Sequence, residues 1–241
     1  MKPKKSSYIQ LDSAKIHFEI YGSEGETLLL LHGNGENGAD CYARQLEPLS
    51  KDHTVIVMDS RGQGKSTFGI KKLTIKQIAA DAFALLEALG VDKVSVIGFS
   101  DGANVAMEML LSEKSGIIEK AVLAGGNLDP SGVKEIYQKP IELSFKLLAS
   151  KARKSSAARR KLSVMALMVR EPNISPDALG KISAPVLVMA GSRDMIKEAH
   201  TELIASSIPN AKLKIIPGCG HFVFSKAAGA ANTAVLEFLH E

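Results

Sequence analysis

The sequence has few cysteines, and it lacks any apolar stretch long enough to cross a membrane. Cys41 and Cys219 are the only cysteines among 241 residues, and their spacing forms neither a metal-binding pattern nor a disulfide framework. We therefore expect two free thiols in a reducing compartment. The basic segment 1–7 is not followed by the apolar region of a signal peptide, and no apolar run approaches about 20 residues. These absences predict a cytoplasmic protein with no integral membrane segment.

Strong net charge and internal repeats are also absent. The chain has 30 Lys and Arg against 26 Asp and Glu, a net charge of +4, which gives no electrostatic reason to expect nucleic acid as a partner. No segment recurs at a fixed period. The length of 241 residues fits one large domain, or a core with one insertion, and is sufficient to bury a sizeable core.

Short apolar runs alternate with helical patterns along most of the chain. An antiparallel hairpin is expected over 8–21, and further strands over 27–31, 54–58, 94–99, 120–124, 185–190 and 213–216. Helices are expected over 41–50, 74–89, 103–111, 197–207 and 226–240. This alternation predicts an α/β protein with a mostly parallel, doubly wound sheet. In such sheets, ligands bind beyond the carboxyl ends of the strands.

A serine lies at the junction between one of these strands and the helix that follows. The strand 94–99 is apolar and rich in β-branched residues, and the segment 103–111 is rich in alanine and methionine. Between them is Gly98-x-Ser100-x-Gly102. A serine at such a corner occupies a strained turn that exposes its hydroxyl, and the N-terminus of the helix favours negative charge there. We interpret Ser100 as a nucleophile.

A second glycine-rich loop, 59–66, follows the strand 54–58. It lacks the Gly-x-x-x-x-Gly-Lys-Ser/Thr spacing of a phosphate loop, so nucleotide binding is unsupported. We expect Asp59 and Arg61 to form a structural pair that fixes this loop.

The segment 127–180 differs from the rest of the chain in its hydrophobic pattern and its charge. Its apolar runs are helical, at 141–149 and 162–169, and it holds ten Lys and Arg against five Asp and Glu. We expect a helical lid over 127–180, inserted in a core made of 1–126 and 181–241. The basic runs at 151–154 and 159–161 are typical of a solvated helix face, and a lid that contacts acidic groups or a membrane surface is the alternative.

Three further strand ends carry groups that could act with Ser100. They are the loop 32–38 with His32-Gly33-Asn34-Gly35, then Asp194 after the strand 185–190, and His221 after the strand 213–216. The order Ser, Asp, His is that of the α/β-hydrolase triad. Nearly the whole chain resembles that superfamily, in its small, single-lid serine esterase-like branch. The Gly-Phe-Ser-Asp-Gly elbow is similar to that of valacyclovir hydrolase-type amino-acid-ester hydrolases.

The resemblance implies a role for each member of the triad. Ser100 would be the nucleophile, His221 the general base and then acid, and Asp194 the carboxylate that orients the imidazole. Asp129 is the rival to Asp194, because some members of the superfamily place the acid after the preceding strand. His32 would support the oxyanion loop. The other histidines, His17, His53, His200 and His240, are interpreted as ordinary surface or half-buried residues, and Cys219 as a small packed thiol.

The same resemblance places the oxyanion hole and the substrate pocket. The backbone N–H groups of Asn34 and Asp101 would form the oxyanion hole. The carboxylate of Asp101 either caps the following helix or faces the pocket, where it would favour a positively charged substrate. Substrate-binding residues are expected to be Asp101, Phe99, Phe145, Met165 and Met168.

Together these features predict a serine hydrolase that cleaves small carboxylic esters, with thioesters and amides as related substrates, through an acyl-enzyme. A carbon–carbon bond hydrolase or a perhydrolase would show the same triad, and a non-catalytic binding protein on this fold is the alternative from another class. Neither a metal nor an organic cofactor is implied. The expected partner is a small-molecule ester, and the sequence does not specify an oligomeric state.

Overall fold

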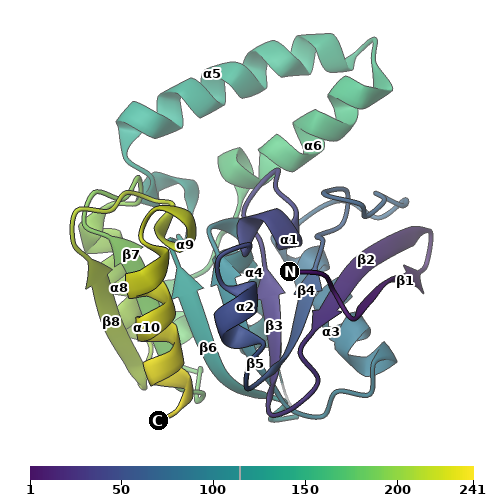
Figure 1. Ribbon diagram of the computed structural model, residues 1–241. Helices are drawn as coiled ribbons and strands as arrows, with labels where there is room; N and C mark the ends of the chain where they lie inside the picture. The colour runs from purple at the N-terminus through teal and green to yellow at the C-terminus, as the bar shows by residue number, and fades with distance from the viewer. Residues whose placement is uncertain (114) are drawn as a thin grey trace.

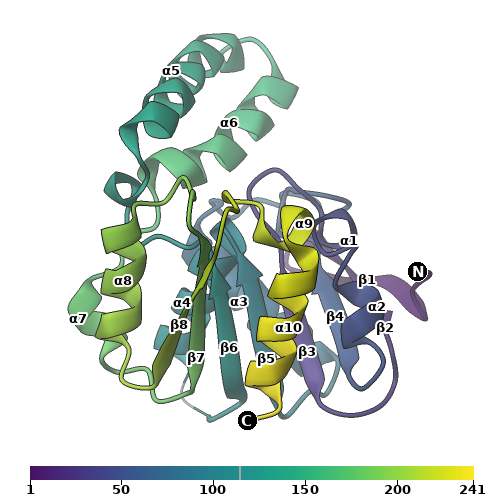
Figure 2. The ribbon, with the colours of Figure 1, turned by 60° about the vertical axis from the view of Figure 1, so that its left-hand side comes forward.

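The computed structural model describes residues 1–113 and 115–241, and its framework is one sheet with helices on both faces (Figures 1 and 2). The strand order is β1-β2-β4-β3-β5-β6-β7-β8, in which β1, β2 and β4 pair antiparallel and the later pairs run parallel. The strands are β1 (Lys5–Leu11), β2 (Ala14–Tyr21), β3 (Thr27–Leu31), β4 (Thr54–Met58), β5 (Val94–Phe99), β6 (Ile118–Ala124), β7 (Val186–Gly191) and β8 (Ala211–Ile216). The expected doubly wound, mostly parallel sheet is confirmed.

Helices on the two faces enclose two apolar cores. On one face α3, α4 and α8 pack against the sheet, and on the other α2 and α10 do so. The helices of the core are α1 (Gly38–Cys41), α2 (Leu46–Leu49), α3 (Ile75–Ala88), α4 (Asp101–Ser112), α7 (Pro176–Leu179), α8 (Glu198–Ser207), α9 (Val223–Lys226) and α10 (Ala228–Leu239). Strand β5 is buried at every position because both of its faces are covered, which is why it is apolar throughout.

Two long helices stand beyond the carboxyl ends of the strands, at the top of Figure 1. They are α5 (Glu135–Ala152) and α6 (Ser156–Arg170), which pack against each other after the short 3-10 turn Pro130–Gly132. Both lie within the segment 127–180 that the sequence singled out, and both are longer than the apolar runs predicted. In the described part of the chain, no helix is long and apolar enough to cross a membrane.

Two local predictions are wrong. The helix expected over 41–50 is replaced by α1 and α2, because Pro48 has no N–H to donate and its ring clashes with a helical backbone one turn earlier. Asp59 and Arg61 do not pair. Asp59 instead contacts His17 Nδ1 at 3.0 Å and accepts hydrogen bonds from the backbone of Gly38 and Lys65.

Arg61 pairs with a residue of α3. Its guanidinium donates to both carboxylate oxygens of Asp81, at 2.7 and 2.6 Å, and to the carbonyl oxygen of Phe68. The two charged side chains are 0% and 2% exposed, and Gln77 donates a further hydrogen bond to Asp81. The loop is therefore fixed to α3 rather than to itself.

Two of the remaining histidines are more buried than expected. His17 is 3% exposed, between Asp59 and Ser6, and His53 is 4% exposed, with its ring against the carbonyl oxygen of Leu49. Each has a polar partner, which the sequence pattern did not reveal. Cys219 is buried as predicted, and burial raises the pKa of its thiol.

Replacing Arg61 by alanine is expected to lower the free energy of unfolding by about 3–5 kcal/mol, because Asp81 would be left charged and unpaired in the interior. Urea denaturation followed by circular dichroism measures this. Lys139 and Glu135 form an exposed ion pair, and such pairs contribute little to stability. Lys139→Ala is therefore the matched control and should leave the urea concentration at the unfolding midpoint unchanged. Equal effects of the two substitutions would contradict the role given to the buried pair.

Candidate active site

Ser100 occupies the strained corner that the sequence predicted. Its φ is 55° and its ψ is −119°, between the end of β5 and the start of α4. Its neighbours have no room for side chains, since a Cβ on Gly98 would collide with the backbone of Gly102, and a Cβ on Gly102 would collide with the carbonyl oxygen of Leu31. These close approaches explain why both flanking positions are glycine. The corner holds the Ser100 hydroxyl out above the sheet edge.

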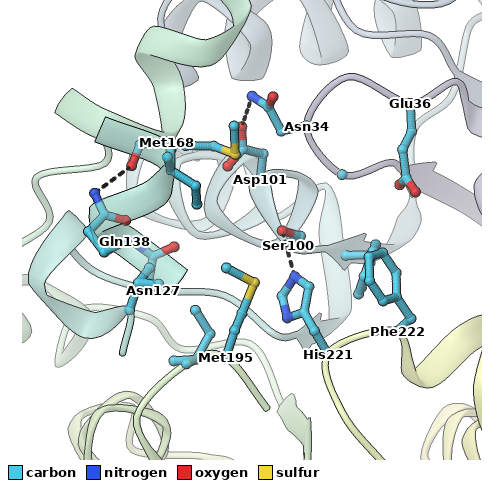
Figure 3. Close-up of a pocket in the computed structure, with 15 residues that line it drawn as sticks. Asn34, Glu36, Ser100, Asp101, Asn127, Gln138, Met168, Met195, His221 and Phe222 are labelled. Atoms are coloured by element: carbon cyan, nitrogen blue, oxygen red, sulfur yellow. Dashed lines mark hydrogen bonds between the residues drawn. The ribbon is translucent and has the colours of Figure 1, made fainter. Parts of the chain in front are cut away.

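The three side chains of the expected triad are connected by hydrogen bonds. Ser100 Oγ lies 3.0 Å from His221 Nε2 (Figure 3). His221 Nδ1 lies 2.8 Å from Asp194 Oδ1. They come from the ends of β5, β8 and β7, which meet at one edge of the sheet. With Nδ1–H donating to Asp194, neutral His221 has Nε2 free to accept the serine proton.

The carboxylate of Asp194 is buried and ionised. Burial raises its pKa, but the hydrogen bond with His221 and the backbone N–H of Ile196 outweigh burial, so its pKa lies below the ordinary value. The rival, Asp129, lies elsewhere and accepts a hydrogen bond from the backbone N–H of Ser131. The geometry therefore pairs His221 with Asp194.

His32 lies beside the site and is bonded to the backbone. Its Nε2 accepts from the N–H of Ser60 at 2.9 Å, and its Nδ1 donates to the carbonyl oxygen of Gly33 at 2.7 Å. Burial lowers the pKa of His32, which keeps the ring neutral. These contacts fix the loop that carries Asn34, consistent with the supporting position expected for His32.

The side chain of Asn34 joins three parts of the site, a feature that the sequence analysis missed. Its Nδ2 donates to Asp101 Oδ2 and to the carbonyl oxygen of Val164 in α6, both at 2.8 Å. It thereby fastens the loop after β3 to the elbow and to the helices above. Within the residues described, neither the backbone N–H of Asn34 nor that of Asp101 has a hydrogen-bond partner. Both are available to a ligand.

The carboxylate of Asp101 faces the pocket and the Asn34 amide. Asp101 lines the pocket and is also the acidic residue in the first turn of α4. Burial raises the pKa of Asp101 to about 6, against the opposing hydrogen bond from Asn34. Ionisation of this group therefore falls close to neutral pH.

Because the folded protein binds this proton more tightly than the unfolded chain does, the charged carboxylate destabilises the fold above about pH 6. That cost disappears as the pH falls toward 3.8, the ordinary aspartate value. Asp101→Asn should thus raise Tm at pH 7.5 and change it little at pH 4, with the difference growing between these values. Differential scanning calorimetry across this range tests it. An Asn variant destabilised equally at every pH would contradict the assignment.

A cavity of about 220 Å³ opens above Ser100. Of the predicted substrate-binding residues, Phe99, Asp101 and Met168 line it, whereas Phe145 and Met165 do not. Phe145 lies further along α5, under the guanidinium of Arg170 at 5.0 Å. The lining residues that sequence reasoning missed include Glu36, Asn127, Gln138, Met195, Ile196 and Phe222. Helical periodicity indicates one face of α5 but not how far along that face the cavity extends.

Charge in this cavity is of one sign. Glu36 and Asp101 are both lining residues, and no Lys or Arg is among those described. The buried Oε2 of Glu36 has no hydrogen-bond partner in the described structure. Figure 3 shows this carboxylate on the side of the site nearest Phe222. Such a cavity suits a ligand that brings a hydrogen-bond donor, and not one that brings several negative charges.

The site brings together the side chains of Ser100, His221 and Asp194. A hydroxyl, an imidazole and a carboxylate in this order can carry out nucleophilic attack on a carbonyl carbon. Unpartnered N–H groups at the elbow can stabilise the resulting oxyanion.

Proteins similar to this chain in sequence include hydrolases. Residues 26–149 match the family model described as alpha/beta hydrolase fold. A 2-hydroxy-6-oxononadienedioate/2-hydroxy-6-oxononatrienedioate hydrolase of Dechloromonas aromatica is 30% identical over 262 residues, covering 93% of this chain and 90% of the relative.

Solved structures agree in fold. A thermophilic esterase from Thermogutta terrifontis has a TM-score of 0.82 at 22% identity, covering 98% of each chain. A meta-cleavage product hydrolase from Pseudomonas fluorescens has a TM-score of 0.79 at 20% identity, covering 99% of this chain and 98% of its own. At these identities the structures show the fold alone.

Proposed function

Because the chain belongs to the α/β-hydrolase family and is a hydrolase, we propose that it acts through a covalent acyl-enzyme on Ser100. The observation that carries the proposal is the unbroken chain of hydrogen bonds from Ser100 through His221 to Asp194 at the cavity floor. A serine hydroxyl is a weak nucleophile until a base removes its proton, and this arrangement supplies that base.

The reaction follows from the positions of these groups. Ser100 Oγ adds to a carbonyl carbon while its proton moves to His221 Nε2, and Asp194 stabilises the imidazolium. The tetrahedral intermediate then collapses, the bond to the leaving group breaks, and His221 returns the proton to the leaving atom. A water molecule attacks the acyl-enzyme, giving its proton to His221, and Ser100 leaves with that proton.

The backbone N–H groups of Asn34 and Asp101 are proposed as the oxyanion hole. Each such donor typically contributes about 10²–10³ in rate. The Asn34 side chain donates a hydrogen bond to the carboxylate of Asp101. This contact would hold the two backbone N–H groups at a fixed distance from each other. Asn34 is thus both a donor through its backbone and a positioning residue through its amide.

We assign the segment 127–180 as a lid over a core formed by 1–126 and 181–241. Five residues of this segment line the cavity, namely Asn127, Val133, Gln138, Ile141 and Met168. Their side chains would set the shape of the substrate that enters. Phe99 and Asp101 would bind the substrate from the core side.

The bond broken is proposed to be a carbon–carbon bond next to a ketone. The compound in the name of the Dechloromonas relative has carboxylates, a hydroxyl and a ketone but no ester, so its hydrolysis must break a carbon–carbon bond. Several further curated relatives carry the same activity in their names. The comparisons therefore favour this chemistry over the ester hydrolysis expected from the sequence.

Ester hydrolysis is the second candidate, and the charge of the cavity supports it. A dioate ion would meet Glu36 and Asp101, with no Lys or Arg among the described lining residues to offset the repulsion. An uncharged ester meets no such repulsion. For the same reason, a carbon–carbon substrate of this enzyme should have a neutral group where the relative's compound has its second carboxylate.

A panel of three substrates tests both candidates. It consists of a 2-hydroxy-6-oxo-dienoate with a neutral aryl arm, the corresponding dioate, and p-nitrophenyl esters of rising chain length. We expect kcat/KM to be highest for the dienoate with the neutral arm, measured by loss of its dienol absorbance. Faster turnover of the esters would favour the second candidate. Turnover of none of these at a rate that depends on Ser100 would overturn the proposal.

A further inference from the structure

The helical pair α5 and α6 presents an outer surface that the proposed hydrolysis does not use. In Figures 1 and 2 the pair extends away from the sheet as an arm, with its far turn distant from the rest of the chain. The inner side of the arm carries Gln138, Ile141 and Met168 to the cavity. Among the described residues, the main contacts of α5 with other elements are those with α6.

Large apolar side chains project from the outer side of α5. Ile136, Leu143 and Leu147 are 76%, 59% and 62% exposed. At 3.6 residues per turn they point within about 40° of one another, so they form a single stripe along the helix. Tyr137, at 45% exposure, projects about 100° from Ile136 around the helix, at the edge of the stripe. A solvated helix face normally carries polar residues, and a continuous apolar stripe there indicates a binding surface.

Basic residues flank this stripe and cover the far turn. No Asp or Glu occurs between Glu142 and Glu171. Over the same stretch the cations are Lys146, Lys151, Arg153, Lys154, Arg159, Arg160, Lys161 and Arg170. Within the described part of the chain none of them forms a salt bridge. From Lys146 onward the arm is therefore basic, and within the described residues none of these charges is paired.

We propose that this outer arm surface, formed by Ile136, Tyr137, Leu143, Leu147 and the basic residues of 146–161, docks on an anionic lipid bilayer. Apolar side chains on a helix lying in the interface plane enter the boundary of the acyl chains, while neighbouring Lys and Arg contact anionic headgroups. A bilayer would therefore bind both the apolar stripe and the basic residues of this surface.

Other occupants satisfy only part of this pattern. A second copy would bring an equally basic arm against the first, so the like charges would repel. Nucleic acid would contact the cations but leave the apolar stripe in water. Of these three partners, only an anionic bilayer has a negatively charged headgroup layer directly above an apolar acyl-chain layer. Docking would also bring the cavity mouth, which the same two helices roof, close to the membrane, where apolar substrates concentrate.

Vesicle co-sedimentation of the full-length protein tests the proposal. The probes are vesicles of phosphatidylcholine alone and of equal parts phosphatidylcholine and phosphatidylglycerol, in low and high salt. We expect binding to the anionic vesicles only, weakened by salt. The triple variant Arg153→Ala, Arg159→Ala, Arg160→Ala should bind about a hundredfold more weakly, because each basic residue near the surface contributes about fivefold.

Two further variants separate the two parts of the surface. Leu143→Ser with Leu147→Ser keeps the charge and should also weaken binding, whereas alanine at Lys51, Lys72 and Lys181 removes three charges elsewhere and should leave it unchanged. Labelling of Ser100 by a fluorophosphonate, or melting temperature if labelling fails, reports that each variant is folded. Equal binding to both vesicle types, no binding, or arm-dependent dimers in light scattering would overturn the proposal.

Discussion

Replacing Ser100 by alanine is expected to lower kcat by about six orders of magnitude, with little change in the affinity for substrate. The alanine removes the atom that forms the covalent bond, while the cavity and the N–H donors of the oxyanion hole remain. Residual hydrolysis would come from water bound in place of the hydroxyl. Steady-state kinetics on the best substrate of the panel measure the loss, and Ser206→Ala, an exposed serine on α8, is the matched control.

The triad should also behave as a unit. His221→Ala alone is expected to lower kcat about as much as Ser100→Ala does. The double variant should have a kcat no lower than that of either single variant. Losses that multiply would mean that Ser100 and His221 act independently, which would contradict a mechanism in which His221 removes the Ser100 proton.

Asp194→Asn should lower kcat by about 10⁴ without unfolding the protein. The carboxylate now accepts the Nδ1 proton of His221 at 2.8 Å, which leaves Nε2 able to accept a proton from Ser100. An asparagine amide can donate to Nδ1 instead, which places the imidazole proton on Nε2, so the ring can no longer act as a base.

Asp129→Asn is the matched control for this effect. The same chemical change is made at the rival position, whose carboxylate only accepts a hydrogen bond from Ser131 in a turn. We expect near-normal kcat. A larger loss at Asp129 than at Asp194 would show that the sequence-derived rival is the true partner of His221.

The strand-to-helix corner and the order of the three side chains could be predicted from sequence because their signals are local. Gly98, Ser100 and Gly102 lie within five residues, and the change from an apolar strand to a helix surrounds them. Asp194 and His221 each follow a recognisable strand, and parallel strands end at the same edge of a sheet. Pattern and topology are sufficient for these positions.

Contacts between distant side chains could not be predicted in this way. Arg61 was expected to pair with Asp59, two residues away, but it pairs with Asp81 across the α3 interface. Asn34 bonds Asp101 and Val164, which are 67 and 130 residues away. Nothing in the local composition distinguishes these partners from other polar residues, because they are chosen by the packing of whole elements.

The residues that line the cavity from α5 were misjudged for a related reason. Gln138, Ile141 and Phe145 share one side of the helix, and only the first two reach the cavity. Helical periodicity identifies the side of α5 that faces inward. The position of the cavity along α5 depends instead on how the helical pair packs on the core. Gln138 was not among the substrate-binding residues expected from sequence, although a polar side chain can line a cavity as well as an apolar one.

The most direct test of the acyl-enzyme mechanism is the intact mass of the protein after incubation with a fluorophosphonate, for the wild type and for Ser100→Ala. We expect one adduct on the wild type, mapped by peptide digestion to Ser100, and none on the variant. An adduct that persists on the variant at the same rate, or a wild-type protein that stays unmodified, would contradict an activated Ser100.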